Sequence, residues 1–344
     1  MSKLPLFVTF LAVLAGPIRA EVPQVVTDIA PIHALTAQVM DGVGVPELLV
    51  RPGLSPHSYA LRPSQARALQ DADLVVWVGE GLAPWLEKPL ASLAGGSDML
   101  ELMEAEGTVR LAYRGAEDVL AAAAGPDDHG DHADHDGHED HGDHADHAAE
   151  ASHEDHDDHD GTAEGEAGHH HTGAYDPHAW LDPQNGSLWL GLIAEHLSAL
   201  DPEHAETYRA NAIAGQAEIS AAVEAVTEAL RPMQGVAFVS YHDAFQYFER
   251  RFGLTLVGTV TPGDATDPSP AQLAQLRDRL ADLGVRCAFA EPQFDTRLLQ
   301  AAVAGRDIPI LELDPLGRAH ELGKGLYPAL IRDLGTGFAA CVGG

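Results

Sequence analysis

Basic residues are scarce in this sequence: 20 Lys and Arg stand against 53 Asp and Glu, which gives a formal net charge of −33. Nucleic-acid-binding proteins neutralise phosphates with Lys and Arg, so this composition argues against a nucleic-acid partner. The imbalance is greatest in residues 127–171, which contain 17 acidic residues and no basic ones. The composition therefore favours cations as partners.

Cysteine is also nearly absent, and Cys287 and Cys341 are the only two. A zinc site built from thiolates would need more cysteines at close spacing, whereas a lone pair in an oxidising compartment typically forms a disulfide. Closing this span would stabilise the fold by about 4 kcal/mol, because the unfolded chain loses entropy. We expect such a disulfide to tie the C-terminal tail to the core.

A continuous apolar run of membrane-spanning length is missing as well. Residues 4–15 are apolar, but Pro17 and Arg19 interrupt the run before it reaches the roughly 20 residues that a transmembrane helix needs. We expect residues 1–20 to be a signal peptide, cleaved near Ala20, and the mature protein to be soluble outside the cytoplasm. No cysteine follows the apolar run, so we expect no lipid anchor.

The sequence does contain a regular alternation of strands and helices. Short apolar segments rich in β-branched residues predict strands at 22–26, 47–50, 73–79, 236–240, 254–260, 287–291 and 308–313. Helix-like stretches lie between most of them, and this order predicts an α/β fold with mostly parallel sheets. Because the strands fall into two groups, we expect two β/α lobes.

One long helix is predicted to join the lobes. Asp182 and Asp201 are each followed by proline, as at a helix start, and the second pattern continues to about Arg231. Some 30 helical residues span about 45 Å, which is more than one sheet needs. The expected division is an N-terminal lobe over 21–201, a rigid linking helix over 202–232 and a C-terminal lobe over 233–344.

Residues 127–171 interrupt this alternation. Their only apolar side chains are alanines, so no core can form and we expect disorder in the absence of metal. Histidine recurs at every third position from 129 to 147 and again at 153, 156 and 159. Expansion of a short repeat explains this spacing better than a helical stripe does.

Four candidate metal ligands lie where an open α/β sheet binds its ligands, beyond the carboxyl ends of strands. His57, His242 and Asp314 each follow a predicted strand, and His178 lies in a proline-flanked loop before a helix. Two of the four come from each lobe. We expect them to meet in a cleft between the lobes.

This donor set favours zinc, which takes four tetrahedral nitrogen, sulfur or oxygen ligands. Manganese prefers more carboxylate, and calcium and magnesium prefer oxygen throughout. Each residue also has a structural alternative: Asp314 could cap a turn, and Asp176, Asp182 and Asp243 could either orient the ligands or cap helices. Structural roles are expected for the other histidines outside the acidic segment, which are His33, His196, His204 and His320.

An exported zinc hydrolase is the alternative from another class of protein. Such an enzyme would hold zinc on three protein ligands with an open water site and would add a general base. The sequence contains no HExxH, no GxSxG and no phosphate-binding glycine loop. Glu291 follows a strand and could be that base or a structural partner. We expect a binding protein rather than an enzyme.

Six motifs, in order along almost the whole mature chain, resemble one family. They are TDIAPIHALTAQVMDGVG, PGLSPHSYALRPSQARAL, DPHAWLDPQN, SYHDAFQYF, FAEPQF and LDPLG. The family is that of the zinc-specific, ZnuA-type solute-binding proteins of bacterial ABC importers. The resemblance implies a monomeric periplasmic protein with two β/α lobes, a rigid linking helix, one metal between the lobes and a histidine-rich loop. It also implies delivery of Zn²⁺ to a membrane permease that a cytoplasmic ATPase drives.

The same resemblance assigns the ligands residue by residue. His57, His178 and His242 match the metal-binding histidines, and related manganese-binding members tend to carry glutamate in place of the last one. Some zinc members have a glutamate directly before the first histidine, but Pro56 stands there in this chain. Asp314 matches the aspartate that other members of the wider group use, so the resemblance makes it the expected fourth ligand, with water as the alternative. The two cysteines match a disulfide pair of the zinc branch.

The resemblance also gives the segment 127–171 an accessory role. Neutral imidazoles are free to coordinate, but a flexible chain loses entropy when it closes around an ion, so its sites are weaker than a pre-formed cleft. We expect it to gather or sense zinc; a solvated spacer with chance metal affinity is the alternative. For the whole protein, the alternatives are a manganese or broader divalent-cation carrier, the zinc hydrolase, and a surface adhesin, which the missing lipid-anchor cysteine makes less favourable.

Overall fold

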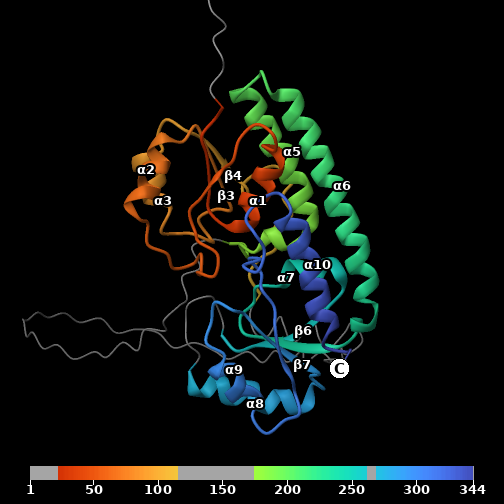
Figure 1. The fold of residues 1–344 in the computed structure, drawn as a ribbon. Coiled ribbons are helices and arrows are strands. Elements are labelled where there is room, and N and C mark those ends of the chain that lie inside the picture. The colour runs from red at the N-terminus through yellow and green to blue at the C-terminus, as the bar shows by residue number, and fades with distance from the viewer. Residues whose placement is uncertain (1–21, 115–173, 262–268, 344) are drawn as a thin grey trace, which may run out of the picture.

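The computed structural model describes residues 22–114, 174–261 and 269–343, and Figure 1 shows two lobes stacked end to end beside one long helix. The expected signal peptide and the histidine-rich segment 127–171 lie outside the described residues. Within the described ranges, no helix is both long enough and apolar enough to cross a membrane.

The N-terminal lobe is built on a four-stranded parallel sheet with the order β2-β1-β3-β4. Its strands are β1 (Val25–Thr27), β2 (Glu47–Leu48), β3 (Leu74–Trp77) and β4 (Asp98–Glu101). Strands β2 and β3 lie within segments that the sequence predicts, and β1 overlaps the predicted segment 22–26 but ends one residue later. The sequence prediction missed β4, because its DMLE residues are two acids, a Met and a Leu, with only Leu100 buried.

The C-terminal lobe repeats the arrangement with a parallel sheet of the order β6-β5-β7-β8. Its strands are β5 (Ala237–Ser240), β6 (Thr255–Thr259), β7 (Cys287–Ala290) and β8 (Ile310–Glu312). All four lie within predicted segments. The two parallel sheets with their helices confirm the expected α/β fold.

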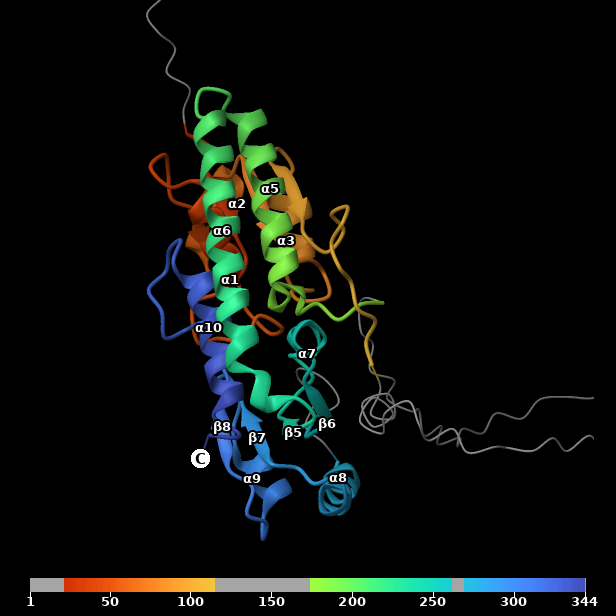
Figure 2. The same ribbon diagram turned by 90° about the vertical axis from the view of Figure 1, so that its right-hand side faces the viewer.

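Helices cover both faces of each sheet. In the first half they are α1 (Ala30–Val39), α2 (Pro63–Asp71), α3 (Glu87–Leu93), the short η1 (Ala179–Leu181) and α5 (Pro183–Leu200). In the second half they are α6 (Ala205–Ala229), η2 (Arg231–Met233), α7 (Gln246–Phe252), α8 (Pro270–Asp282), α9 (Arg297–Val303) and α10 (Leu326–Ala339). Helices α8 and α9 lie on the side of the second sheet that is remote from the first lobe, whereas α7 lies between that sheet and the first lobe (Figures 1 and 2).

The long helix α6 runs alongside both lobes (Figure 2). It begins at Ala205, three residues later than the sequence predicts, because Asp201 does not cap it. The Asp201 carboxylate instead accepts a hydrogen bond from the hydroxyl of Tyr208 and lies 2.7 Å from Nδ1 of His204. By contrast, Asp182 caps α5 as predicted, accepting from the backbone N–H of Gln184.

Helices α5 and α10 pack along α6, and α10 also contacts α1 of the first lobe. The C-terminal helix therefore returns from the second lobe to the first. One buried apolar cluster extends through both lobes, from Ile32 and Trp189 to Phe238 and Phe338. The predicted disulfide is confirmed: Cys287 of β7 is bonded to Cys341, which follows α10.

Candidate metal centre

Three histidines converge where the lobes meet. His57 lies in the loop after β2, His178 directly precedes η1, and His242 follows β5. One nitrogen from each can be chosen so that all three atoms lie within 4.8 Å of one another, and this is the one such group of potential metal ligands among the described residues. His178 and His242 are buried, and His57 is half-buried.

Local hydrogen bonds fix the loops that carry these rings. Backbone carbonyl oxygen of Pro56 accepts from the indole N–H of Trp85 at 2.7 Å, which holds the first loop against its own lobe. The hydroxyl of Ser240 donates to the carbonyl of His242 at 2.7 Å and so closes the turn after β5. The backbone N–H of His178 donates to Asp176 Oδ1 at 3.0 Å.

Two buried carboxylates orient two of the rings. His178 Nδ1 lies 2.7 Å from Asp176 Oδ1, and His242 Nδ1 lies 2.5 Å from Glu291 Oε1. A carboxylate accepts hydrogen bonds, so each Nδ1 carries the proton and each Nε2 keeps its lone pair for a cation. Glu291 is therefore the structural partner of His242, which is one of the two roles that the sequence left open.

The distance between the two rings suits a single tetrahedral zinc ion. The Nε2 atoms of His178 and His242 are 3.4 Å apart. Two nitrogens bound to one zinc at about 2.0–2.1 Å in tetrahedral geometry lie roughly 3.3 Å apart. The cavity beside them has a volume of about 20 Å³, which is near the minimum for one water molecule. The site thus has space for one ion and very little else.

Burial changes the ionisation of the Asp176 carboxyl beside the histidines. Burial raises the pKa of the Asp176 carboxyl above its ordinary value, and the neighbouring His178 ring opposes that rise. Trp180 packs against His178 with ring centroids 5.3 Å apart, so water has little access from that side. A cation bound here would restore the charge balance that burial makes unfavourable for the carboxylates.

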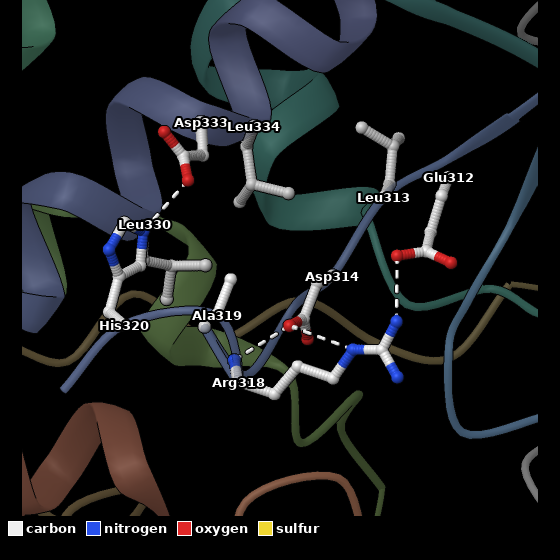
Figure 3. A pocket seen from close by; sticks show the side chains of 10 residues that line it. Glu312, Leu313, Asp314, Arg318, Ala319, His320, Leu330, Asp333 and Leu334 are labelled. Atoms are coloured by element: carbon white, nitrogen blue, oxygen red, sulfur yellow. Dashed lines mark hydrogen bonds and ion pairs between the residues drawn. The ribbon is translucent and has the colours of Figure 1, made fainter. Parts of the chain in front are cut away.

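Asp314 lies beside the three histidines without joining their group. Its neighbours Pro315 and Leu316 line the histidine cavity. Its own oxygens accept from the backbone N–H of Leu316 at 3.0 Å and of Arg318 at 2.7 Å, and Nε2 of Gln293 is 3.3 Å away. In Figure 3 its carboxylate faces a separate cavity of about 220 Å³, where it lies next to Arg318. Its role as the fourth ligand stays a prediction.

The other histidines among the described residues lie away from this centre, and each has a partner. The ring nitrogen of His33 lies 3.1 Å from the Pro46 carbonyl oxygen, and the remaining three each pair with an aspartate. These pairs are His196 with Asp98, His204 with Asp201 and His320 with Asp333.

Asp243 has a role that the sequence did not indicate. It forms an ion pair with Arg114 of the first lobe. No sequence pattern indicates that contact, because Arg114 lies in an irregular segment outside the predicted helices and strands.

Comparison with known proteins decides the family. The family model for ZnuA, the periplasmic component A of a zinc-uptake complex, matches residues 25–341. The chain belongs to the ZnuA family. It is 49% identical over 334 residues to the high-affinity zinc uptake system protein ZnuA of Paracoccus denitrificans (strain Pd 1222), covering 97% of this chain and 96% of that protein. It is 40% identical over 337 residues to the protein of the same name from Brucella abortus (strain 2308), with 97% and 96% coverage.

Solved structures show the same fold at lower identity. The solute-binding protein FpvC from Pseudomonas aeruginosa, solved in complex with Mn²⁺, superposes with a TM-score of 0.70 at 20% identity, covering 94% of this chain and 99% of that one. Members of the ZnuA family are solute-binding components of transport systems. The family, the fold and the histidine centre together indicate which ion the protein carries.

Proposed function

We propose that this protein captures Zn²⁺ in the periplasm and delivers it to the membrane permease of an ABC importer, which a cytoplasmic ATPase drives. The ligands are His57, His178 and His242, with Asp314 or a water molecule as the fourth. The observation that carries the proposal is the convergence of three imidazoles whose nitrogens lie within 4.8 Å of one another. The names of the related zinc uptake proteins support the same cargo.

The ligand chemistry favours zinc over manganese. Three neutral imidazoles suit zinc, whereas manganese prefers carboxylate, carbonyl and water oxygens. The fold by itself does not choose, because a solute-binding protein with this fold has been solved with Mn²⁺. The carboxylates of Asp176 and Glu291 approach the Nδ1 atoms and so act on the rings rather than as first ligands.

Binding and release are the functional steps, and no chemistry occurs on the ion. Glu291, the residue best placed to act as a general base, is engaged with His242 at 2.5 Å. The protein acts as a monomer, exported with its signal peptide cleaved near Ala20 and without a lipid anchor. Residues 127–171 gather or sense zinc at weaker sites and are accessory to the centre between the lobes. The lobes span 21–201 and 233–344, with 202–232 between them.

Calorimetric titration tests this function. The mature protein and a variant without residues 127–171 are titrated with Zn²⁺ and with Mn²⁺, in the presence and absence of a competing chelator. We expect both proteins to retain one tight zinc site, with weaker manganese binding, and His57→Ala to abolish the tight site. Loss of tight binding on deletion of 127–171 would show that the cargo site lies in that segment instead.

A further inference from the structure

The two chain segments that flank the undescribed residues 115–173 form a short stem in the first lobe. The stem consists of residues 109–114 and 174–178. Ala112 and Tyr175 form an isolated antiparallel bridge, and the backbone N–H of Asp176 donates to the carbonyl of Leu111 at 2.8 Å. The second segment ends at His178, so the stem leads directly into the metal centre.

Helix α7 of the second lobe holds this stem from the other side. The hydroxyl of Tyr247 donates to the Asp176 carbonyl at 2.8 Å and accepts from the backbone N–H of Leu111 at 2.9 Å. The amide of Gln246, in the orientation that satisfies both of its polar atoms, donates to the carbonyl of Ala112 at 3.3 Å and to Asp176 Oδ2 at 2.9 Å. Both strands of the stem are therefore bonded to one short helix.

We call the contact between the stem and α7 the joint. It also includes a cluster of ion pairs. The guanidinium of Arg114 donates to both oxygens of Asp243, with Nε–Oδ2 2.7 Å and Nη2–Oδ1 2.6 Å, and to Glu249 Oε1 at 2.9 Å. The three side chains are 14%, 20% and 4% exposed, respectively. A bidentate pair of this kind, largely removed from water, holds its partners in a defined geometry.

The joint contacts both buried ligands of the metal centre. Asp176, which Gln246 and Tyr247 hold, orients the ring of His178. Asp243, which Arg114 holds, directly follows His242 in the chain. One of these ligands comes from each lobe, so the joint spans the same gap that the bound ion would bridge.

We propose that Arg114 is a positioning residue for the metal centre: by clamping Asp243 and Glu249 across the lobes it fixes the separation of His178 and His242 and slows release of the bound cation. The proposal rests on the proposed function, in which these histidines are zinc ligands. Arg114 does not touch the ion. Its effect is on the lobe spacing, and through it on how long zinc is retained.

The first test measures zinc release from the full mature chain, by chelator capture in stopped flow. Arg114→Gln removes the positive charge and the bidentate hydrogen bonds to Asp243. We expect the slow phase of release, in which zinc leaves the tight site, to accelerate about 10- to 100-fold, which is the usual cost of losing a group that orients metal ligands. Arg114→Lys restores the charge without the bidentate geometry and is expected to recover part of the loss. The matched control is Arg110→Gln, in the same segment, whose two partners, Glu104 and the ring of Tyr175, both lie in its own lobe.

The second test measures the distance between the lobes without relying on zinc. Nitroxide labels are placed at Ser92→Cys on α3 and Gln300→Cys on α9, both exposed positions, and the native cysteines are held in their disulfide. We expect pulsed electron resonance to show a broader distance distribution for Arg114→Gln than for Arg110→Gln, with and without zinc. Where Arg114→Gln fails to fold, Glu249→Gln, which keeps the Asp243 pair, is expected to show a smaller change in the same direction.

The two readouts separate the possible failures. Faster release together with a broader distribution supports the clamp. Unchanged release, or faster release with an unchanged distribution, overturns it, because Arg114 would then act on stability alone or by another route. If neither the parent nor Arg110→Gln shows a slow zinc phase, the proposed function fails and the role in zinc retention fails with it, whatever the distances show.

Discussion

At the scale of single residues, the metal centre depends on pairs in which a carboxylate holds an imidazole. The chain contains the same pairing in two settings. In the centre, Asp176 and Glu291 are buried and hold His178 and His242, whereas Asp98 holds His196 at the surface of the first lobe. The chemistry of the pair is the same in both places, so the difference in function comes from the second and third rings nearby.

This contrast makes a direct prediction. Asp176→Asn keeps an oxygen that can accept from His178 Nδ1 but removes the charge that makes the ring a stronger donor to the metal. We expect the affinity of the tight zinc site to fall about 10-fold or more in calorimetry. Asp98→Asn alters the matching pair with His196, at 2.6 Å, and is expected to leave that affinity unchanged. An equal loss in both variants would mean that the effect is not specific to the centre.

Asp28 is a buried residue whose ionisation opposes folding. Its two oxygens accept from the backbone N–H groups of Ile29 and Val78, both at 2.8 Å. Burial nevertheless raises its pKa from 3.8 to about 7. Because the folded carboxyl binds its proton more tightly than the unfolded one, its favourable contribution is full below about pH 4 and is lost as the pH rises towards 7.

A rise of about three pKa units corresponds to about 4 kcal/mol of unfolding free energy across that window. Asparagine does not titrate, so Asp28→Asn should remove this loss. Between pH 4 and 7, we therefore expect the free energy of unfolding of the zinc-free variant to change in a more favourable direction than that of the parent protein. Urea unfolding at several pH values, in chelator, measures the difference between the two proteins. Parallel stability curves would show that Asp28 stays ionised in the folded protein.

At the scale of elements, close packing between helices depends on glycines, because the missing side chain leaves space for a residue of another helix. A Cβ added at Gly186 of α5 would lie 2.3 Å from the hydroxyl oxygen of Tyr327, a fully buried side chain that donates to the Trp180 carbonyl. We expect Gly186→Ala to lower the free energy of unfolding by about 1–3 kcal/mol, the usual cost of overpacking a core. Gly191→Ala on the same helix has no neighbour closer than 3.9 Å and is expected to raise it by up to about 1 kcal/mol.

Denaturant unfolding of both variants measures the two changes. Opposite signs for the same substitution on one helix would establish that packing against Tyr327, rather than helix propensity, decides the outcome at Gly186. A stabilised Gly186→Ala would mean that α5 and α10 can separate slightly at no cost. The zinc affinity of the Gly191 variant serves as a check that the metal centre is intact.

Sequence patterns predicted the strands well where apolar residues dominate the segment. Of the eight strands among the described residues, seven lie in or overlap predicted apolar segments, whereas β4 was missed because its two apolar residues stand between acids and only Leu100 is buried. The start of α6 was misplaced, since an Asp–Pro pair looks the same whether its carboxylate caps a helix or holds Tyr208. Those alternatives differ in tertiary contacts that a local pattern does not contain.

The metal centre was also predictable in part: local patterns indicated its histidines, whereas its tertiary contacts lie outside such patterns. His57 and His242 could be named because the ends of parallel strands share one edge of a sheet. His178 could be named because it lies in a proline-flanked loop before a helix, and the structure brings the three together. The sequence left open whether Asp314 binds the metal or caps a turn, and the contacts of Arg114 could not be foreseen. The first depends on competition from backbone N–H groups at residues 316 and 318, and the second on a contact between lobes.

At the scale of the whole molecule, the two lobes share one large apolar cluster, and each lobe also has a smaller cluster of its own. Helices α5, α6 and α10 pack together, and α10 carries the chain from the second lobe back against α1 of the first. The apolar cluster continues from Ile32 to Phe338 without a break at the boundary. Since the lobes bury the same surface, we expect them to unfold together rather than one after the other.

Zinc should therefore shift one transition that involves both lobes. Binding that favours the folded state adds stability by mass action, about 4 kcal/mol when free zinc is 1,000 times the dissociation constant. In scanning calorimetry we expect a single transition that moves to higher temperature with zinc, and His57→Ala to remove that shift while keeping one transition. Two transitions, of which zinc moves one, would show that the ion contacts a single lobe and that the shared helices do not couple the other to it.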